Sequence, residues 1–260
     1  AMVARLYCMA QGTLGIITKV AVTLKTEMPK KEVLFYGCKN INKATEALKA
    51  FVGTEQPHEI FAVNKTYLSE LLGQKVTGDT APWVVVLVNR GADKAEVEYK
   101  RKDQSAIAKK LGGKLHATIK GVKNAGDTIL AEIKAPTGAE LHQGTKSWAP
   151  IVSVATAAQI TKCSPLMPKS SGAIMMPVNA GGSFYYQPDL RYKESDVDAA
   201  RKEYLAICNK MLKANVMFPR PSALIAKEVA KKYPDNFKLL RSFKQAIDPK
   251  NIMNPGKLGL

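Results

Sequence analysis

The chain has 260 residues, 46% of them hydrophobic, which is enough for one large globular domain or two small ones. Its longest apolar run, Trp83–Val88, is far shorter than the roughly 20 residues that span a bilayer, so a membrane span is excluded. Lys and Arg outnumber Asp and Glu by 39 to 22, and this net charge of +17 suits an acidic ligand or partner. Because the lysines are dispersed along the sequence, specific nucleic-acid binding is not expected.

The chain opens with a glycine loop that leads into an apolar run. Residues 11–19 are QGTLGIITK, and Val20–Leu24 alternates apolar and polar residues. Gly12 and Gly15 permit positive φ values and leave backbone amides uncovered. The alternation that follows predicts a strand. The polar, proline-containing segment at residues 27–31 predicts a domain boundary.

Short strands and helices alternate over the next 90 residues. A helix is predicted from Asn40 or Asn42, either of which can cap it, to Gly53, while residues 92–97 suit helix or strand equally. This order predicts an α+β fold with helices on one face of a mainly antiparallel sheet. The other elements predicted here are strands at 33–37, 59–63, 83–88 and 115–119 and helices at 65–72 and 105–111.

Prolines and glycines interrupt every periodic run from residue 121 to 188, which predicts a loop-rich segment. Within it, Ile174–Val178 and Ser183–Tyr186 are predicted strands on either side of a glycine hairpin. Three helices are predicted after it, at 195–213, 222–232 and 237–247. Ser195 is the expected N-cap of the first, and Asp248-Pro249 is expected to end the last.

Two motifs at opposite ends of the chain resemble the FAD-linked oxidoreductases related to vanillyl-alcohol oxidase and p-cresol methylhydroxylase. Residues 12–18 are GTLGIIT, like the family's loop and strand beside the cofactor, and residues 243–257 are FKQAIDPKNIMNPGK, like its closing motif. The resemblance covers only the C-terminal portion of the family. It implies a ferredoxin-like cap domain at 29–240 between two small pieces of the FAD-binding domain, residues 1–28 and 241–260.

The resemblance also implies where FAD is held. The family's glycine-rich pyrophosphate loop normally lies upstream of these motifs. With Met2 as the expected start, that half is expected on a separately encoded N-terminal subunit, and the isolated chain is expected to bind FAD weakly and to be inactive. The implied cofactor-binding residues are Gly12, Thr13, Leu14, Gly15, Ile16, Asn254 and Lys257, with His142 near the position of a covalent flavin link in some relatives.

The substrate candidates are Arg220 and Tyr185. Phenol-oxidising relatives carry a Tyr-Arg pair where this chain has Pro219-Arg220, so the resemblance argues against a phenol substrate. A guanidinium can bind a carboxylate through two parallel hydrogen bonds, which suits a small anionic substrate. Tyr185 and Tyr186 point to opposite faces of a strand, so at most one lines a pocket. The implied reaction is hydride transfer to the flavin.

Other interpretations stay open at this point. Gly12 and Gly15 also suit a plain turn, Arg220 a surface arginine and Lys257 a solvated lysine. The whole chain could be a folded but non-catalytic remnant or a basic binding module. Four scattered cysteines and three scattered histidines argue against a metal site, and cysteines of this kind without an export signal predict a cytoplasmic protein.

Overall fold

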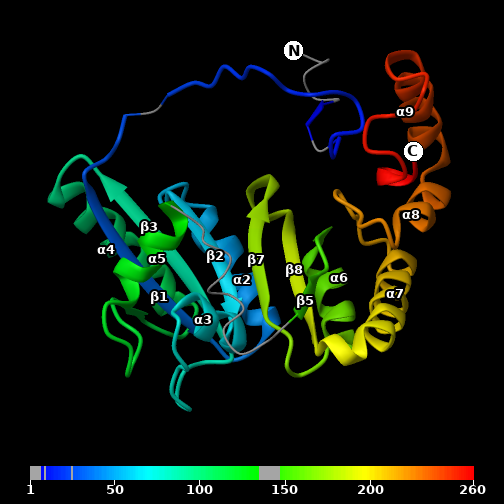
Figure 1. Ribbon diagram of the computed structural model, residues 1–260. Coiled ribbons are helices and arrows are strands. Elements are labelled where there is room, and N and C mark those ends of the chain that lie inside the picture. Colours follow the sequence, from blue (N-terminus) through cyan, green and yellow to red (C-terminus); the bar gives the residue numbers. More distant parts are fainter. Residues whose placement is uncertain (1–6, 9, 25, 135–146) are drawn as a thin grey trace.

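The computed structural model describes residues 7–8, 10–24, 26–134 and 147–260. An eight-stranded sheet runs through the molecule in the order β4-β1-β3-β2-β7-β8-β5, with β6 also paired to β8 (Figure 1). The strand pairs of the described residues are all antiparallel, which confirms the predicted α+β fold. The strands are β1 Lys30–Cys38, β2 Glu59–Asn64, β3 Trp83–Gly91, β4 Leu115–His116, β5 Ser147–Pro150, β6 Ser153–Ala155, β7 Ala173–Val178 and β8 Ser183–Tyr192.

Helices cover both faces of this sheet. On β3, Val85 and Leu87 belong to one hydrophobic core, whereas Val84, Val86 and Val88 belong to a second core on the opposite face. The prediction of helices on one face only was therefore wrong, because β3 is apolar on both sides and each side needs cover. The helices are α2 Ile41–Val52, α3 Lys65–Leu71, α4 Lys94–Lys110, α5 Ala125–Lys134, α6 Ala157–Cys163, α7 Val197–Lys213, α8 Ala226–Lys232 and α9 Pro234–Ile247.

The first half of the sheet is a ferredoxin-like unit. Strands β1 to β4 have the order β4-β1-β3-β2, and α2 and α4 pack together over the first core. Asn40 caps α2 by accepting a hydrogen bond from the Lys43 amide at 2.9 Å, as predicted. Helix α4 includes the ambiguous residues 94–97, and β4 is only two residues long, shorter than the predicted strand.

The segment from 121 to 188 is more regular than predicted. Its described parts include α5, β5, β6 and α6 in addition to the predicted hairpin β7–β8. At the turn of that hairpin, Gly181 has φ +82°. Thr156 and Gln159 form a reciprocal capping box at the start of α6, so a local helix signal was present in the sequence.

The C-terminal helices stack along one side of the molecule, and the N-terminal segment lies beside α9 (Figure 1). Helix α7 starts at Val197, because Glu194–Asp196 forms a separate 3-10 turn, so the predicted N-cap Ser195 was wrong. Helix α8 starts at Ala226, four residues later than predicted. Residues 16–24 form no strand, so the predicted strand Val20–Leu24 was also wrong.

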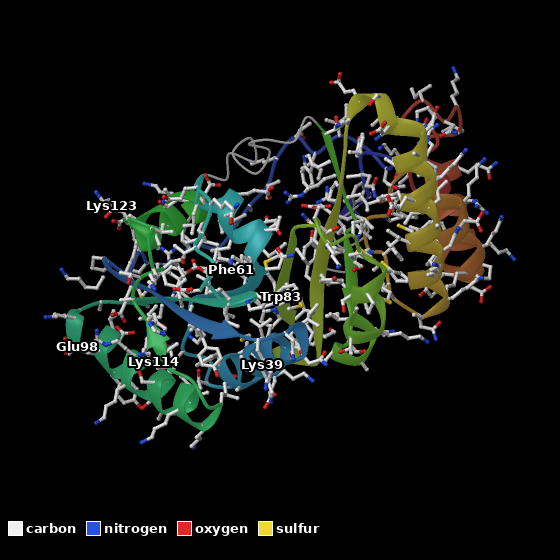
Figure 2. All side chains as sticks on the ribbon, turned by 90° about the horizontal axis from the view of Figure 1, so that it is seen from below. Lys39, Phe61, Trp83, Glu98, Lys114 and Lys123 are labelled. Atoms are coloured by element: carbon white, nitrogen blue, oxygen red, sulfur yellow. The ribbon has the colours of Figure 1, made fainter. Side chains whose placement is uncertain are left out.

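Charged side chains are spread over the surface. Figure 2 shows Lys39, Lys114 and Lys123 in three different connecting segments, and all three are exposed. This dispersal does not favour the basic binding module. Cys38, Cys163 and Cys208 are buried free thiols, whereas Cys8 is exposed. In the described part of the chain, no helix combines the length and apolar character needed to cross a membrane.

Candidate active site

The glycine loop has the backbone that its sequence predicts. Gly12 has φ +74° and Gly15 has φ +149°, values that strain any residue with a side chain. The amide and hydroxyl of Thr13 both donate to the carbonyl oxygen of Ala10, at 3.1 and 2.7 Å. These two hydrogen bonds fold residues 10–13 into a tight turn, so both glycines are required by backbone geometry.

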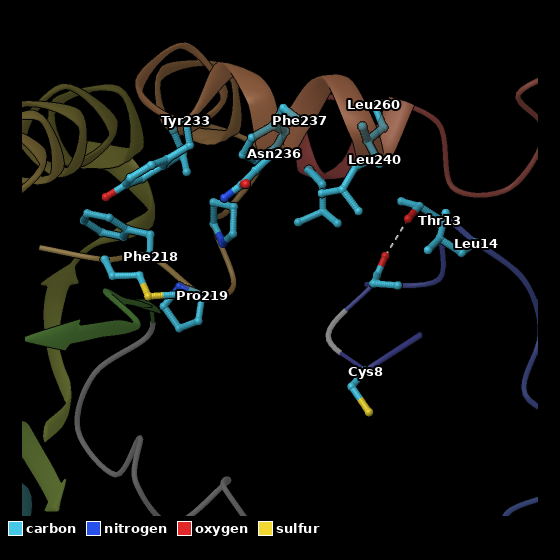
Figure 3. Close-up of a pocket in the computed structure, with 15 residues that line it drawn as sticks. Cys8, Thr13, Leu14, Phe218, Pro219, Tyr233, Asn236, Phe237, Leu240 and Leu260 are labelled. Atoms are coloured by element: carbon cyan, nitrogen blue, oxygen red, sulfur yellow. Dashed lines mark hydrogen bonds between the residues drawn. The ribbon is translucent and has the colours of Figure 1, made fainter. Parts of the chain in front are cut away.

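The loop presents some residues to solvent and buries others. Gly12 is exposed and Ile16 is 80% exposed, whereas Thr13 and Leu14 are 0% and 2% exposed. Figure 3 shows Thr13 and Leu14 beside Leu240 and Leu260 at an apolar cavity of about 440 Å³. These two side chains fasten the loop to the C-terminal segment. Their predicted contact with a cofactor stays a prediction, since a backbone contact would leave both side chains where they are.

Hydrogen bonds join the loop to two distant parts of the chain. The side-chain amide of Asn254 donates to the Gln11 carbonyl at 2.6 Å. The side-chain amide of Gln11 donates to the Pro221 carbonyl at 3.3 Å. The glycine loop, the closing motif and the segment that carries Arg220 therefore meet at one place.

The closing motif is shaped by a buried ion pair. Asp248 accepts hydrogen bonds from the amides of Ile252 and Met253, at 3.1 and 2.8 Å. Lys244 donates to the Asp248 carboxylate and to the Met253 carbonyl. The hydrogen bond from Lys244 and those from the two amides lower the pKa of Asp248 below its usual value. This network fixes the turn that presents Asn254 to the loop.

Tyr185 and Arg220, the two predicted substrate residues, line the same cavity. The cavity is about 590 Å³ and lies between β5, β8, α7 and the segment 220–224. Tyr186, by contrast, is 2% exposed and belongs to the core. Strand alternation therefore turned one tyrosine into the cavity and its neighbour into the core.

The two residues differ in charge and in their partners. The Tyr185 hydroxyl donates to the side-chain carbonyl of Gln187 at 2.8 Å. Burial raises the pKa of Tyr185 above its usual value, and the positive charge of Arg220 partly offsets this rise. The phenol is therefore neutral at pH 7. Arg220 is exposed and forms no ion pair with any residue in the described ranges.

Several cavity residues escaped the sequence analysis. Tyr204 is 5% exposed and belongs to the core, and it lines the cavity as well. Arg201 lies three residues before it on α7, so helical periodicity could have placed both on one face. No local pattern marks Gln11 or Trp148, which reach the cavity through the tertiary fold.

Two predicted cofactor residues are less defined by the structure. Lys257 is partly buried, and its backbone amide donates to the Asn254 carbonyl at 3.4 Å. Its predicted contact with a phosphate stays a prediction. His142 lies outside the described residues.

Comparisons with known proteins agree with the resemblance seen in the sequence. The family described as FAD linked oxidases, C-terminal domain, matches residues 225–258. The structure of p-cresol methylhydroxylase with substrate bound superposes with a TM-score of 0.70 at 16% identity, over 90% of this chain and 53% of that one. Alkyldihydroxyacetonephosphate synthase superposes with a TM-score of 0.59 at 15% identity, over 94% of this chain and 47% of that one. No curated protein sequence matches the chain.

These matches establish the fold and show how much of each solved structure the chain corresponds to. The chain spans about half the length of both solved structures. Their identities are low, so the superpositions establish shared architecture, while the family match locates the shared sequence at the C-terminal end.

Proposed function

We propose that this C-terminal part of an FAD-linked oxidase supplies the substrate-binding wall of a flavin site and a small part of the wall that holds FAD. The observation that carries the proposal is the hydrogen bond from Gln11 to the Pro221 carbonyl, next to Arg220. It ties the glycine loop, which resembles the family's cofactor loop, to the rim of the cavity that holds Tyr185 and Arg220.

The residues of the loop fit a large planar cofactor. Gly12 is exposed, and because it has no side chain a ligand can approach its backbone closely. Ile16 adds an exposed apolar surface beside it. Gly12, Gly15 and Ile16 would contact FAD, and Asn254 would hold the loop in place. When bound, FAD supplies the acceptor for a hydride removed from a substrate carbon.

The cavity residues would bind and orient a small anionic substrate. No carboxylate of the described residues pairs with the guanidinium of Arg220, so its fork is available to an anion. Tyr185 stays protonated at neutral pH and donates a hydrogen bond, now satisfied by Gln187. In the complex it would donate to the substrate and hold the reacting carbon in position.

The remainder of the FAD site would come from a pyrophosphate-binding half outside these 260 residues, on a longer polypeptide or on a separate subunit. Every described residue from 16 to 24 is exposed, including five large apolar side chains. Such a run of uncovered apolar residues usually marks an interaction site. These residues are Ile16, Ile17, Val20, Val22 and Leu24.

Flavin binding tests this function. The 260-residue chain would be purified alone and together with the pyrophosphate-binding half, taken from the longer polypeptide or from a neighbouring reading frame that encodes it, and flavin would be quantified by its absorbance after gel filtration. We expect flavin to accompany the combined protein and to be lost in a Gly12→Val variant, where a side chain at positive φ distorts the loop. Stoichiometric flavin on the isolated chain would overturn the requirement for a second half, and flavin-free combined protein would overturn the function.

A further inference from the structure

Two arginines at the candidate substrate cavity are the only described arginines without a partner. Arg90, Arg101 and Arg191 each form an ion pair with a glutamate, and Arg241 donates to the Gly259 carbonyl. Arg201 and Arg220 form neither an ion pair nor a hydrogen bond with any residue in the described ranges. Both line the same cavity of about 590 Å³. Unpaired guanidiniums on one cavity constitute a site for a negatively charged group.

The rest of the cavity wall is mostly aromatic and apolar, with Gln11, Gln187 and Ser222 as its polar members. The lining contains no Asp or Glu from the described part of the chain, so nothing there neutralises the two arginines. Aromatic faces favour stacking with a flat, apolar ligand. The aromatic lining residues are Trp148, Tyr185, Tyr192 and Tyr204.

The two arginines come from different elements. Arg201 lies on the second turn of α7, and Arg220 lies in the segment that connects α7 to α8. Tyr204, one turn after Arg201, is held by the core and by its hydroxyl, which donates to the Pro150 carbonyl at 3.5 Å. Tyr204 is thus held in place in the aromatic wall, whereas the two arginines are exposed.

From this arrangement we propose that the cavity binds an aromatic carboxylate, with Arg201 and Arg220 both holding the carboxylate and the aromatic wall holding the ring. Arg201 thereby becomes a specificity-determining residue. This inference rests on the proposed function for the position of the site. A carboxylate offers two oxygens, so it can accept hydrogen bonds from both guanidiniums. A ring buried against the aromatic wall adds apolar area that a small inorganic anion lacks.

The test measures binding of 2-naphthoate to the full chain by isothermal titration calorimetry, without flavin. The neutral isostere 2-naphthamide reports on the aromatic wall alone, and inorganic phosphate reports on charge alone. We expect 2-naphthoate to bind at least tenfold more tightly than either. Equal affinity for the acid and the amide, or for the acid and phosphate, would overturn the proposal.

Variants assign the effect to the two arginines. Arg201→Gln and Arg220→Gln should each weaken 2-naphthoate binding at least fivefold and leave 2-naphthamide binding unchanged. The matched control is Lys202→Gln, which removes one positive charge from an exposed neighbouring position on α7 and should leave both affinities as in the wild type. An Arg201→Gln variant that binds 2-naphthoate like the Lys202→Gln control would refute the role of Arg201. Flavin does not enter this assay, so failure here is distinct from failure of the flavin-binding test.

Discussion

Truncation of Leu14 should release the glycine loop without unfolding the rest of the chain. Within the described part of residues 7–24, only Ala10, Thr13 and Leu14 are buried, and Leu14 is the largest of them. It is 2% exposed and packs at the apolar cavity beside Leu240 and Leu260 (Figure 3). Leu14 is therefore the main apolar anchor of the loop, alongside the two hydrogen bonds of Gln11.

The expected size of the effect follows from that burial. A Leu→Ala change in a packed site costs about 2–5 kcal/mol, and the low end applies here because the side chain already borders a cavity. A loss of about 2–3 kcal/mol raises the fraction of open loop about 30- to 150-fold. Because residues 16–24 are already exposed, the opening stays local and the global free energy of unfolding should change little.

Amide hydrogen exchange at Thr13 measures this opening, since that amide donates to the Ala10 carbonyl at 3.1 Å in the closed loop. Leu14→Ala should accelerate exchange by the same factor. The control is Ile16→Ala, two residues away and 80% exposed in the wild type, which should change exchange less than twofold. Unchanged exchange at Thr13 in Leu14→Ala would refute the anchoring role of Leu14.

Two further predictions concern buried charges and thiols. Arg191→Met should leave the carboxylates of Glu70 and Asp189 buried without a cation, because both now pair with Arg191. This change should lower the free energy of unfolding, measured by urea titration, by about 3–5 kcal/mol. A smaller loss would contradict a stabilising role for this buried network. Burial raises the pKa of Cys38 from 9.0 to about 12. Well below pH 9 the thiol is neutral in both states, and as the pH rises through 9 it ionises in the unfolded chain first, so stability falls. Between pH 8 and 10 the wild type should therefore lose about 1.4 kcal/mol more stability than Cys38→Ala, and parallel pH profiles of the two proteins would contradict this.

Local sequence patterns predicted the elements whose cause is local. The continuous apolar run Trp83–Val88 predicted a strand, and the resulting β3 contributes to both cores. The candidate caps Asn40 and Asn42 and the closing Gly53 predicted α2, and its residues Ala44, Leu48 and Phe51, at helical spacing, are buried. Each of these signals acts within one turn or along one strand, so the sequence itself contains the information.

The wrong predictions came from sequence patterns whose structure depends on a second, distant segment. The alternation of Val20–Leu24 is typical of a half-buried strand, but a strand needs a neighbour to accept its hydrogen bonds, and the described residues offer none. The one-face prediction for the helices failed in a similar way, because the face that a helix covers depends on tertiary packing. Both α3, which was predicted, and α5, which lies in the segment whose prolines and glycines suggested loops, cover the second face. The prolines and glycines of the same segment also obscured the capping box formed by Thr156 and Gln159 at the start of α6.

The individual residues of the candidate site could be predicted from the sequence, but their arrangement in space could not. The glycines, Tyr185 and Arg220 each carried a recognisable pattern, whereas the hydrogen bonds that join them link residues 210 and 243 positions apart. Those bonds have a mechanical consequence. Gln11 accepts from Asn254 through its carbonyl and donates to Pro221 through its side chain, so the glycine loop cannot shift without moving relative to both the closing motif and the Arg220 segment. Gln11, the residue that precedes the recognisable motif, thus fixes the position of the proposed cofactor wall relative to the rim of the substrate cavity.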